Sequence, residues 1–170
     1  MLKKKYHIVI KTILAIFLLS STGYANVLED AKEYNGHYYK IFDFQVAWKD
    51  AKKFCESVGG HLATIETQGE YDVINELVKN GSLRDFGYWL GGYRTSNGLW
   101  KWIDGKLITG NHWASGYPTT ETLESANNLK TYYYNDVIKS LWVNPGFYDG
   151  KENGLVCEWE SVNDAHDPNM

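Results

Sequence analysis

Two segments early in the chain carry hydrophobic residues at the spacing of an α-helix. In the first, apolar side chains recur every three or four positions over residues 47–58, until Gly59-Gly60 ends the pattern. Asp43 precedes this segment and is a suitable N-cap residue. The second segment begins with Thr67 and Glu70 at the spacing of a capping box. Its apolar face consists of Tyr71, Ile74, Leu77 and Val78. We therefore predict two consecutive helices.

Short apolar or alternating runs bounded by turn residues make up much of the remaining chain, and they are typical of β-strands. The runs lie at residues 37–42, 89–92, 99–103, 132–134, 141–143 and 155–159. Asn97-Gly98 and Asp104-Gly105 are dipeptides favoured in hairpin turns. The pattern predicts an α+β fold in which two helices accompany antiparallel strands.

Residues 110–130 follow neither period and are rich in Gly, Thr, Asn and Ser. An aperiodic stretch of this length within a compact domain is usually functional or disordered. We interpret it as a long irregular loop. Residues 162–170 are polar, and we expect them to form a frayed tail.

The first 25 residues have the three parts of a secretory signal. Lysines at positions 3–5 precede an apolar stretch at 13–19, and Gly23-Tyr24-Ala25 matches a small-residue cleavage site. The alternative is an uncleaved membrane anchor, but the apolar run over residues 6–19 contains Lys11 and is shorter than the roughly 20 residues that span a bilayer. We predict a signal peptide at 1–25, a single domain at 26–161, and a secreted or periplasmic protein with no membrane attachment after cleavage.

The charge distribution argues against nucleic-acid binding. Four of the 17 basic residues and none of the 21 acidic ones lie in the first 25 positions, so the rest of the chain carries 13 basic and 21 acidic side chains. A protein that neutralises phosphates needs a basic surface, and no Lys/Arg cluster occurs after residue 25.

Cys55 and Cys157 are the only two cysteines. An oxidising compartment favours a disulfide over a pair of free thiols, and two cysteines alone do not make a zinc site. A bond between them would close a loop of about 100 residues, which corresponds to about 4–5 kcal/mol in the chain-entropy model.

Eight sequence features occur in a fixed order over residues 37–160. They are Trp48-x-x-Ala51-x-x-x-Cys55, Gly59-Gly60-His61-Leu62-Ala63-Thr64-Ile65 with Glu70, Trp89-Leu90-Gly91-Gly92, Trp100-x-Trp102-x-Asp104-Gly105, Asn111-x-Trp113, Pro118, Trp142, and Val156-Cys157-Glu158. In this order and spacing they resemble the C-type lectin-like domain, in a secreted, bacterial-type form. The resemblance implies the C-type lectin-like fold, a disulfide between Cys55 and Cys157, and a ligand-binding role for the long loop.

Most of the seven tryptophans are expected in the core, because large aromatic side chains dominate burial. This applies to Trp48, Trp89, Trp102 and Trp142. The rings of Trp100, Trp113, Tyr117 and residues 132–134 lie in or beside the long loop, where an exposed ring can stack on a sugar.

The calcium ligands that sugar-binding members of this family carry in the long loop are mostly missing. Calcium takes six to eight oxygens. The family's Glu-Pro-Asn or Gln-Pro-Asp triplet corresponds here to Tyr117-Pro118-Thr119, and its Asn-Asp pair after a tryptophan corresponds to Val143-Asn144. Only Glu124 and Asn144 remain as side-chain ligands, since Glu121 is displaced from the family position. We therefore expect no required cofactor and no calcium bridge in the loop.

A second, structural calcium site of the family uses the glutamate of the second helix and the glutamate after the last cysteine. Glu70 and Glu158 match these positions, so calcium is possible there. The alternatives are that Glu70 only completes the helix cap and that Glu158 is an ordinary strand-end acid. The family's inner disulfide is absent, because the corresponding positions lie near Ala126 and Asp149.

No catalytic motif is present, so we predict a binding protein rather than an enzyme. The sequence has no Gly-x-Ser-x-Gly elbow, no His-Glu-x-x-His helix and no Walker loop. Two hypotheses for the partner remain open: a glycan bound without the calcium bridge, or a cell-surface protein bound by an adhesin-like surface. In either case we expect ligand contacts within residues 110–144, from Trp113, Tyr117, Glu121, Glu124, Asn127 and Asn144.

Overall fold

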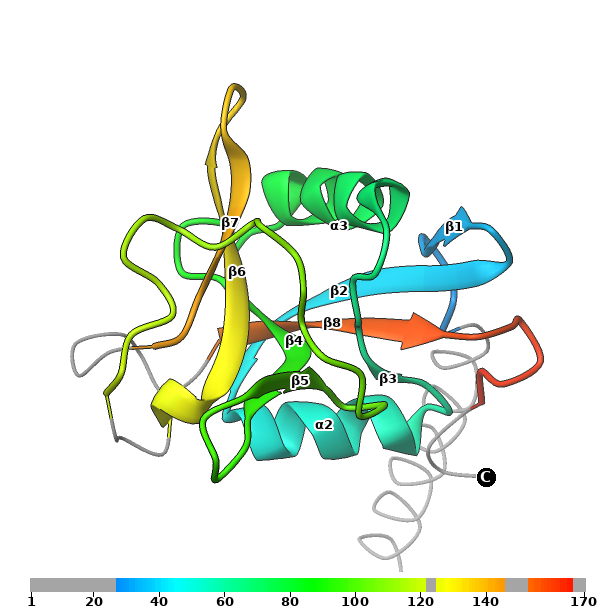
Figure 1. Cartoon of the computed structure of the whole chain (residues 1–170). Coiled ribbons are helices and arrows are strands. Elements are labelled where there is room, and N and C mark those ends of the chain that lie inside the picture. The colour runs from blue at the N-terminus through cyan, green and yellow to red at the C-terminus, as the bar shows by residue number, and fades with distance from the viewer. Residues whose placement is uncertain (1–26, 122–124, 146–152, 167–170) are drawn as a thin grey trace, which may run out of the picture.

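A computed structural model describes residues 27–121, 125–145 and 153–166. The predicted signal peptide and the candidate ligand Glu124 lie outside these ranges. The described chain folds into two α-helices and one sheet (Figure 1). The elements are β1 (Lys32–Tyr34), β2 (His37–Val46), α2 (Trp48–Ser57), β3 (His61–Leu62), α3 (Gln68–Asn80), β4 (Tyr88–Arg94), β5 (Trp100–Trp102), the 3₁₀ turn η1 (Ser125–Asn127), β6 (Asn128–Asn135), β7 (Lys139–Val143) and β8 (Asn153–Trp159).

The strands lie in the order β1-β2-β8-β4-β6-β7, with β3 paired to β8 and β5 paired to β4. The α+β architecture is as predicted, but the sheet is mixed, because β4 and β8 pair in parallel. The chain leaves β4, forms the β5, β6 and β7 strands, and returns beside β4 in the same direction.

The hydrophobic core has two parts, on opposite sides of the β2–β8 pair in Figure 1. On the α3 side, buried Tyr71, Ile74 and Val78 pack with Trp102 and Trp142. On the α2 side, the buried residues are Ala51, Cys55, Val58, Leu62, Trp89, Leu155, Cys157 and Trp159. Neither helix that the structure describes is long and apolar enough to cross a membrane.

The second predicted helix begins as expected. Thr67 Oγ1 accepts a hydrogen bond from Glu70 N (3.3 Å), and Glu70 Oε2 accepts one from Thr67 N (2.7 Å), which completes a capping box. The apolar face of α3 is buried at the four predicted positions, Tyr71, Ile74, Leu77 and Val78. Local sequence signals and tertiary packing therefore agree here.

The predicted start of the first helix is wrong. Asp43 lies within β2, and the helix begins after Ala47, which provides no side-chain cap. Strand β2 continues past Asp43 because Val46 still pairs with Asn153 of β8, after an irregularity in register. The Asp43 carboxylate instead accepts hydrogen bonds from the Tyr88 hydroxyl and from Ser82 N.

The structure corrects two further predictions, the length of the irregular loop and the burial of Trp48. Regular structure resumes at η1 and β6, so the irregular loop is shorter than residues 110–130. Trp48, predicted in the core, is only half-buried and donates its indole N–H to Leu90 O (2.8 Å).

The described part of the tail packs against the end of α2. His166 N donates to Val58 O (3.1 Å), and Gly59 adopts a φ of +81°. A Cβ atom at Gly59 would lie 1.8 Å from Asp164 O, so only glycine fits between the helix end and this turn. Residues 161–166 are therefore a turn held by the domain rather than a frayed end.

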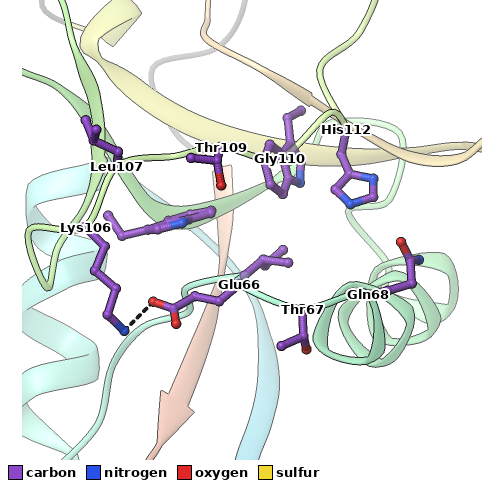
Figure 2. Close-up of a pocket in the computed structure, with 11 residues that line it drawn as sticks. Glu66, Thr67, Gln68, Lys106, Leu107, Thr109, Gly110 and His112 are labelled. Atoms are coloured by element: carbon purple, nitrogen blue, oxygen red, sulfur yellow. Dashed lines mark hydrogen bonds and ion pairs between the residues drawn. The ribbon is translucent and has the colours of Figure 1, made fainter.

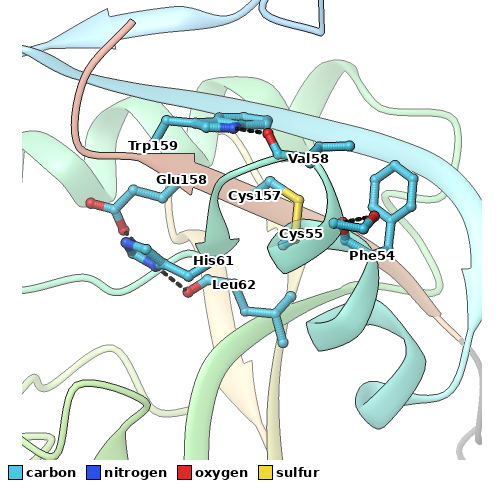
Figure 3. The surroundings of a disulfide bond; sticks show 9 residues. Phe54, Cys55, Val58, His61, Leu62, Cys157, Glu158 and Trp159 are labelled. Atoms are coloured by element: carbon cyan, nitrogen blue, oxygen red, sulfur yellow. Dashed lines mark hydrogen bonds and ion pairs between the residues drawn. A yellow bond between two sulfur atoms is a disulfide. The ribbon is translucent and has the colours of Figure 1, made fainter. Parts of the chain in front are cut away.

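The disulfide joins Cys55 of α2 to Cys157 of β8, as the resemblance implies (Figure 3). Both residues are fully buried. Beside them, Trp159 Nε1 donates to Val58 O (2.9 Å), which fastens the same helix end to the same strand. A covalent bond and a buried hydrogen bond thus connect α2 to the central strand.

Breaking the disulfide should be strongly destabilising. We expect Cys55→Ser to lower the free energy of unfolding by about 2–5 kcal/mol, because a cross-link of 102 residues no longer restricts the unfolded chain. Denaturant unfolding of the oxidised protein and of the variant measures the difference. The variant should contain one free thiol, on Cys157. Free thiols on both cysteines of the oxidised, folded protein would contradict the expectation.

Candidate functional site

The long loop is held to the sheet by Arg94, the last residue of β4. Its Nε donates to Asn127 Oδ1 (2.8 Å), its Nη1 donates to Thr119 O (3.1 Å), and its Nη2 donates to Glu121 O. One guanidinium therefore connects β4 with three separate points of the loop and η1. A rigid, multiply bonded side chain of this kind fixes loop shape at a low entropic cost per hydrogen bond.

Asn144 holds the same loop from the other side. It is fully buried, and its Oδ1 accepts from Thr119 N (2.8 Å). Its Nδ2 donates to Thr119 Oγ1 (3.0 Å) and Ala126 O (2.9 Å). The amide thus forms hydrogen bonds within the protein at both of its ends.

The predicted ligand-contact residues of the described chain lie in three kinds of environment. Tyr117 is half-buried and Glu121 is exposed, so both present side-chain surface in the loop. Asn127 and Asn144 instead position the loop through their hydrogen bonds to Arg94 and Thr119. Trp113 is half-buried and packs edge-on against Trp100 and Trp142, with ring centroids 5.1 and 6.0 Å apart.

A cavity of about 280 Å³ lies between the start of α3 and residues 106–112 (Figure 2). Its apolar walls include the indoles of Trp102 and Trp142. Polar side chains surround these rings: Glu66, Thr67, Gln68, Lys106, Thr109 and His112. Lys106 Nζ donates to Glu66 Oε1 (2.5 Å) across the cavity.

Two residues of the cavity wall, Trp142 and His112, have unusual surroundings. Trp142 is 1% exposed, and its indole N–H is the only buried side-chain polar atom that lacks a hydrogen-bond partner in the described chain. His112 stacks on Tyr71, with centroids 3.7 Å apart, and burial lowers the pKa of its imidazole. His112 is therefore uncharged at neutral pH, and either ring nitrogen that faces a ligand can act as donor or acceptor.

Sequence reasoning missed most of this cavity. Its walls come from two segments about 40 residues apart and from Trp142, and among its polar residues only Thr67 belongs to a recognised motif, the helix cap. The ion pair of Lys106 with Glu66 joins the two segments, and the contact of Trp102 with Trp142, whose centroids lie 5.5 Å apart, adds the wall from β7.

The two glutamates considered for structural calcium lie at another site, near the end of β8. Tyr39 OH donates to Glu158 Oε1 (3.1 Å) and reaches Glu70 Oε1 at 3.4 Å. Burial and these two carboxylates raise the pKa of the Tyr39 hydroxyl. Glu70 Oε2 accepts hydrogen bonds from the backbone N–H groups of Glu66 and Thr67, which leaves Oε1 on the side of Tyr39 and Glu158.

Glu158 has two histidine neighbours that the sequence did not connect with it. It is 2% exposed, and His37 Nδ1 lies 2.9 Å from its Oε1. That hydrogen bond raises the pKa of the His37 imidazole. Burial opposes the charged form of His61, but its hydrogen bond to Leu62 O and the nearby glutamates outweigh burial and raise its pKa. Strand pairing creates the cluster, so no local signal reveals it.

Comparison with known proteins identifies a single protein family. The family model described as "Lectin C-type domain" matches residues 44–159. One subunit of the snaclec coagulation factor IX/factor X-binding protein of Trimeresurus stejnegeri is 34% identical over 149 residues, which cover 82% of this chain and 88% of the relative.

Two solved structures share the fold. The SPL-1–GlcNAc complex superimposes with a TM-score of 0.65 at 23% identity, covering 81% of this chain and 98% of that chain. The Ca²⁺-independent C-type lectin SPL-2 from Saxidomus purpuratus superimposes with a TM-score of 0.63 at 24% identity, covering 76% of this chain and 91% of that chain.

Removing the Asn144 amide should loosen the long loop. We expect Asn144→Ala to lower the free energy of unfolding by about 1–3 kcal/mol, since Thr119 N and Ala126 O lose their buried partners. Denaturant unfolding measures the change. Glu121→Gln is the matched control, because Glu121 is exposed and its backbone rather than its side chain contacts Arg94. Equal stability of the two variants would contradict the assigned role of Asn144.

Proposed function

Because the chain belongs to the C-type lectin domain family, we propose that it is an exported carbohydrate-binding module whose long loop holds its ligand without a calcium ion. The snaclec relative is a binding protein by its name, which agrees with a role in recognition rather than catalysis. The basic and apolar pattern of residues 1–25 supports export to the periplasm or the exterior.

The observation that carries the proposal is the cavity beside the loop. Sugars present hydroxyl groups around a ring with apolar faces, so their sites combine hydrogen-bonding side chains with aromatic surface. The cavity has this composition, with carboxylate, amide, hydroxyl, ammonium and imidazole groups around two indoles. Its volume of about 280 Å³ is at the lower end for ligand sites, which favours a single sugar unit or the end of a glycan chain.

Calcium independence is supported by the donors that the loop offers. Positions 117, 119 and 143 carry Tyr, Thr and Val, and Val143 is buried. Asn144 Oδ1, the remaining amide oxygen, accepts from Thr119 N. A calcium ion needs six to eight oxygens and would have to break this hydrogen bond to gain one. The fold itself permits such a protein, since SPL-2 is described as Ca²⁺-independent.

Protein binding is a second candidate function, favoured by the tip of the β6–β7 hairpin. This hairpin projects from the body of the domain (Figure 1). Val137 at its tip is 90% exposed, and Ile138 and Tyr134 beside it are also exposed. Apolar and aromatic side chains gathered on a projecting tip are typical of protein contacts. The snaclec relative is named for binding coagulation factors, which are proteins.

A glycan array with and without chelator tests the main proposal. We expect bound glycans to be retained in chelator. Thr109→Trp should fill the cavity and weaken glycan binding roughly tenfold or more, because Thr109 is exposed and lines it. Ser96→Trp is the matched control, since Ser96 is exposed and belongs to neither the cavity wall nor the long loop. Tyr117→Ala should also weaken binding, with little change in thermal unfolding.

The opposite results separate the alternatives. Glycan binding that chelator abolishes would contradict calcium independence. An array with no bound glycan, together with capture of a cell-surface protein that Val137→Asp removes, would replace the carbohydrate proposal with the protein-binding one.

A further inference from the structure

Three neighbouring strands bring two histidines and two glutamates to one end of the sheet. Glu158 of β8 pairs with Tyr39 of β2 on one side and with His61 of β3 on the other. His37 precedes Tyr39 by two positions and Glu160 follows Glu158 by two, so both side chains lie on the same face as their partners. The two glutamates therefore meet histidines that lie more than 90 residues earlier in the chain.

Donor atoms of three of these residues, His37, Glu158 and Glu160, lie close enough together to surround one metal ion. His37 Nδ1 is 2.9 Å from Glu158 Oε1 and 3.5 Å from Glu160 Oε2. His61 Nε2 is 3.0 Å from Glu160 Oε1. Four ligands in a tetrahedron around zinc, at about 2.0–2.1 Å each, are about 3.3 Å from one another. The ligand atoms of His37, Glu158 and Glu160 lie within 4.8 Å of one another, and His61 approaches this group through Glu160, so an ion that binds all four side chains also draws the His61 ring inward.

Contacts behind the cluster orient two of the four side chains. His61 Nδ1 lies 3.0 Å from Leu62 O, and because a carbonyl oxygen only accepts, this contact places a proton on Nδ1. The other ring nitrogen, Nε2, faces Glu160 Oε1 at 3.0 Å. Glu158 Oε2 accepts from Thr64 N (2.9 Å), which fixes that carboxylate. Backbone groups that orient histidine and carboxylate ligands in this way are a regular feature of metal sites.

We propose that His37, His61, Glu158 and Glu160 form a binding site for a divalent transition metal of the zinc type. Two imidazole nitrogens and two carboxylates are a donor set for zinc and its neighbours in the first row. Calcium takes oxygen ligands, and Glu70, its other candidate ligand here, is held in the helix cap. The site thus keeps Glu158 but differs from the calcium pair predicted from the sequence.

Access and charge both favour a cation at this position. The cluster lines an open cavity of about 420 Å³, in which six carboxylates face two lysines. The His37 and His61 side chains are 33% and 27% exposed, so a hydrated ion reaches them without opening the fold. Glu158 is nearly inaccessible and provides the buried negative charge that a bound ion neutralises.

Titration of chelator-treated, tag-free protein with zinc chloride in a calorimeter tests the proposal. We expect one zinc ion per chain, unaffected by a large excess of calcium. Glu160→Gln and His37→Gln should each weaken binding at least tenfold. Glu160 is exposed, so its variant is expected to fold even if a histidine variant does not. His166→Gln is the matched control, because His166 is exposed and contacts the Asp164 backbone instead.

Cobalt provides an independent readout of geometry. Co²⁺ in a tetrahedral nitrogen and oxygen site absorbs visible light much more strongly than octahedral Co²⁺, and this absorption should appear with the wild-type protein and the His166→Gln control but not with Glu160→Gln. The proposal is overturned if no zinc binds, if binding persists in both Glu160→Gln and His37→Gln, or if calcium displaces the metal.

Discussion

Strand β8 is buried at all seven of its positions, and a strand of this kind is stable only when both of its faces are covered. One face is covered by α2 and the other by the cluster that includes α3. Its edges pair with β2, β3 and β4. The disulfide fixes α2 against this strand, so the helix that covers it cannot separate without breaking a covalent bond. Both candidate sites depend on this arrangement, because β8 carries Glu158 directly and positions β4, from which Arg94 reaches the loop.

The elements predicted correctly from the sequence are those whose signals are local. The capping box at Thr67 and Glu70 lies within one turn of the helix it starts, and the structure contains it. The predicted start of α2 is wrong because Asp43 has cap chemistry, whereas its strand conformation depends on pairing with β8, more than 100 residues away. The residues around Asp43 carry no information about a pairing partner so far away in the sequence.

The candidate sites also differ in whether local sequence signals or long-range contacts create them. Asn144 is recognisable as a polar residue at a ligand position, but its hydrogen bonds to Thr119 and Ala126 follow from how the loop folds back. His37 and His61 are isolated in the sequence and converge only through the registers of β2 and β3 with β8. Resemblance to a family predicts the positions that the family uses. It does not predict side chains that come together at other positions.

The β2–β8 pairing also determines how the domain responds to tension along its chain. The described chain enters at β1 and leaves after β8, and Tyr38 faces Trp159 at the same end of that antiparallel pair. A force that pulls these two ends apart therefore opens the strands one residue pair at a time, and the opening reaches Lys40 and Cys157 at the third pair. Once Cys157 carries the load, the disulfide passes it to Cys55, and only residues 41–54 remain to be extended on the other side. Tethered at its ends, the domain lengthens only by the residues before Cys55 and after Cys157, while the segment that carries the loop and the cavity cannot be extended.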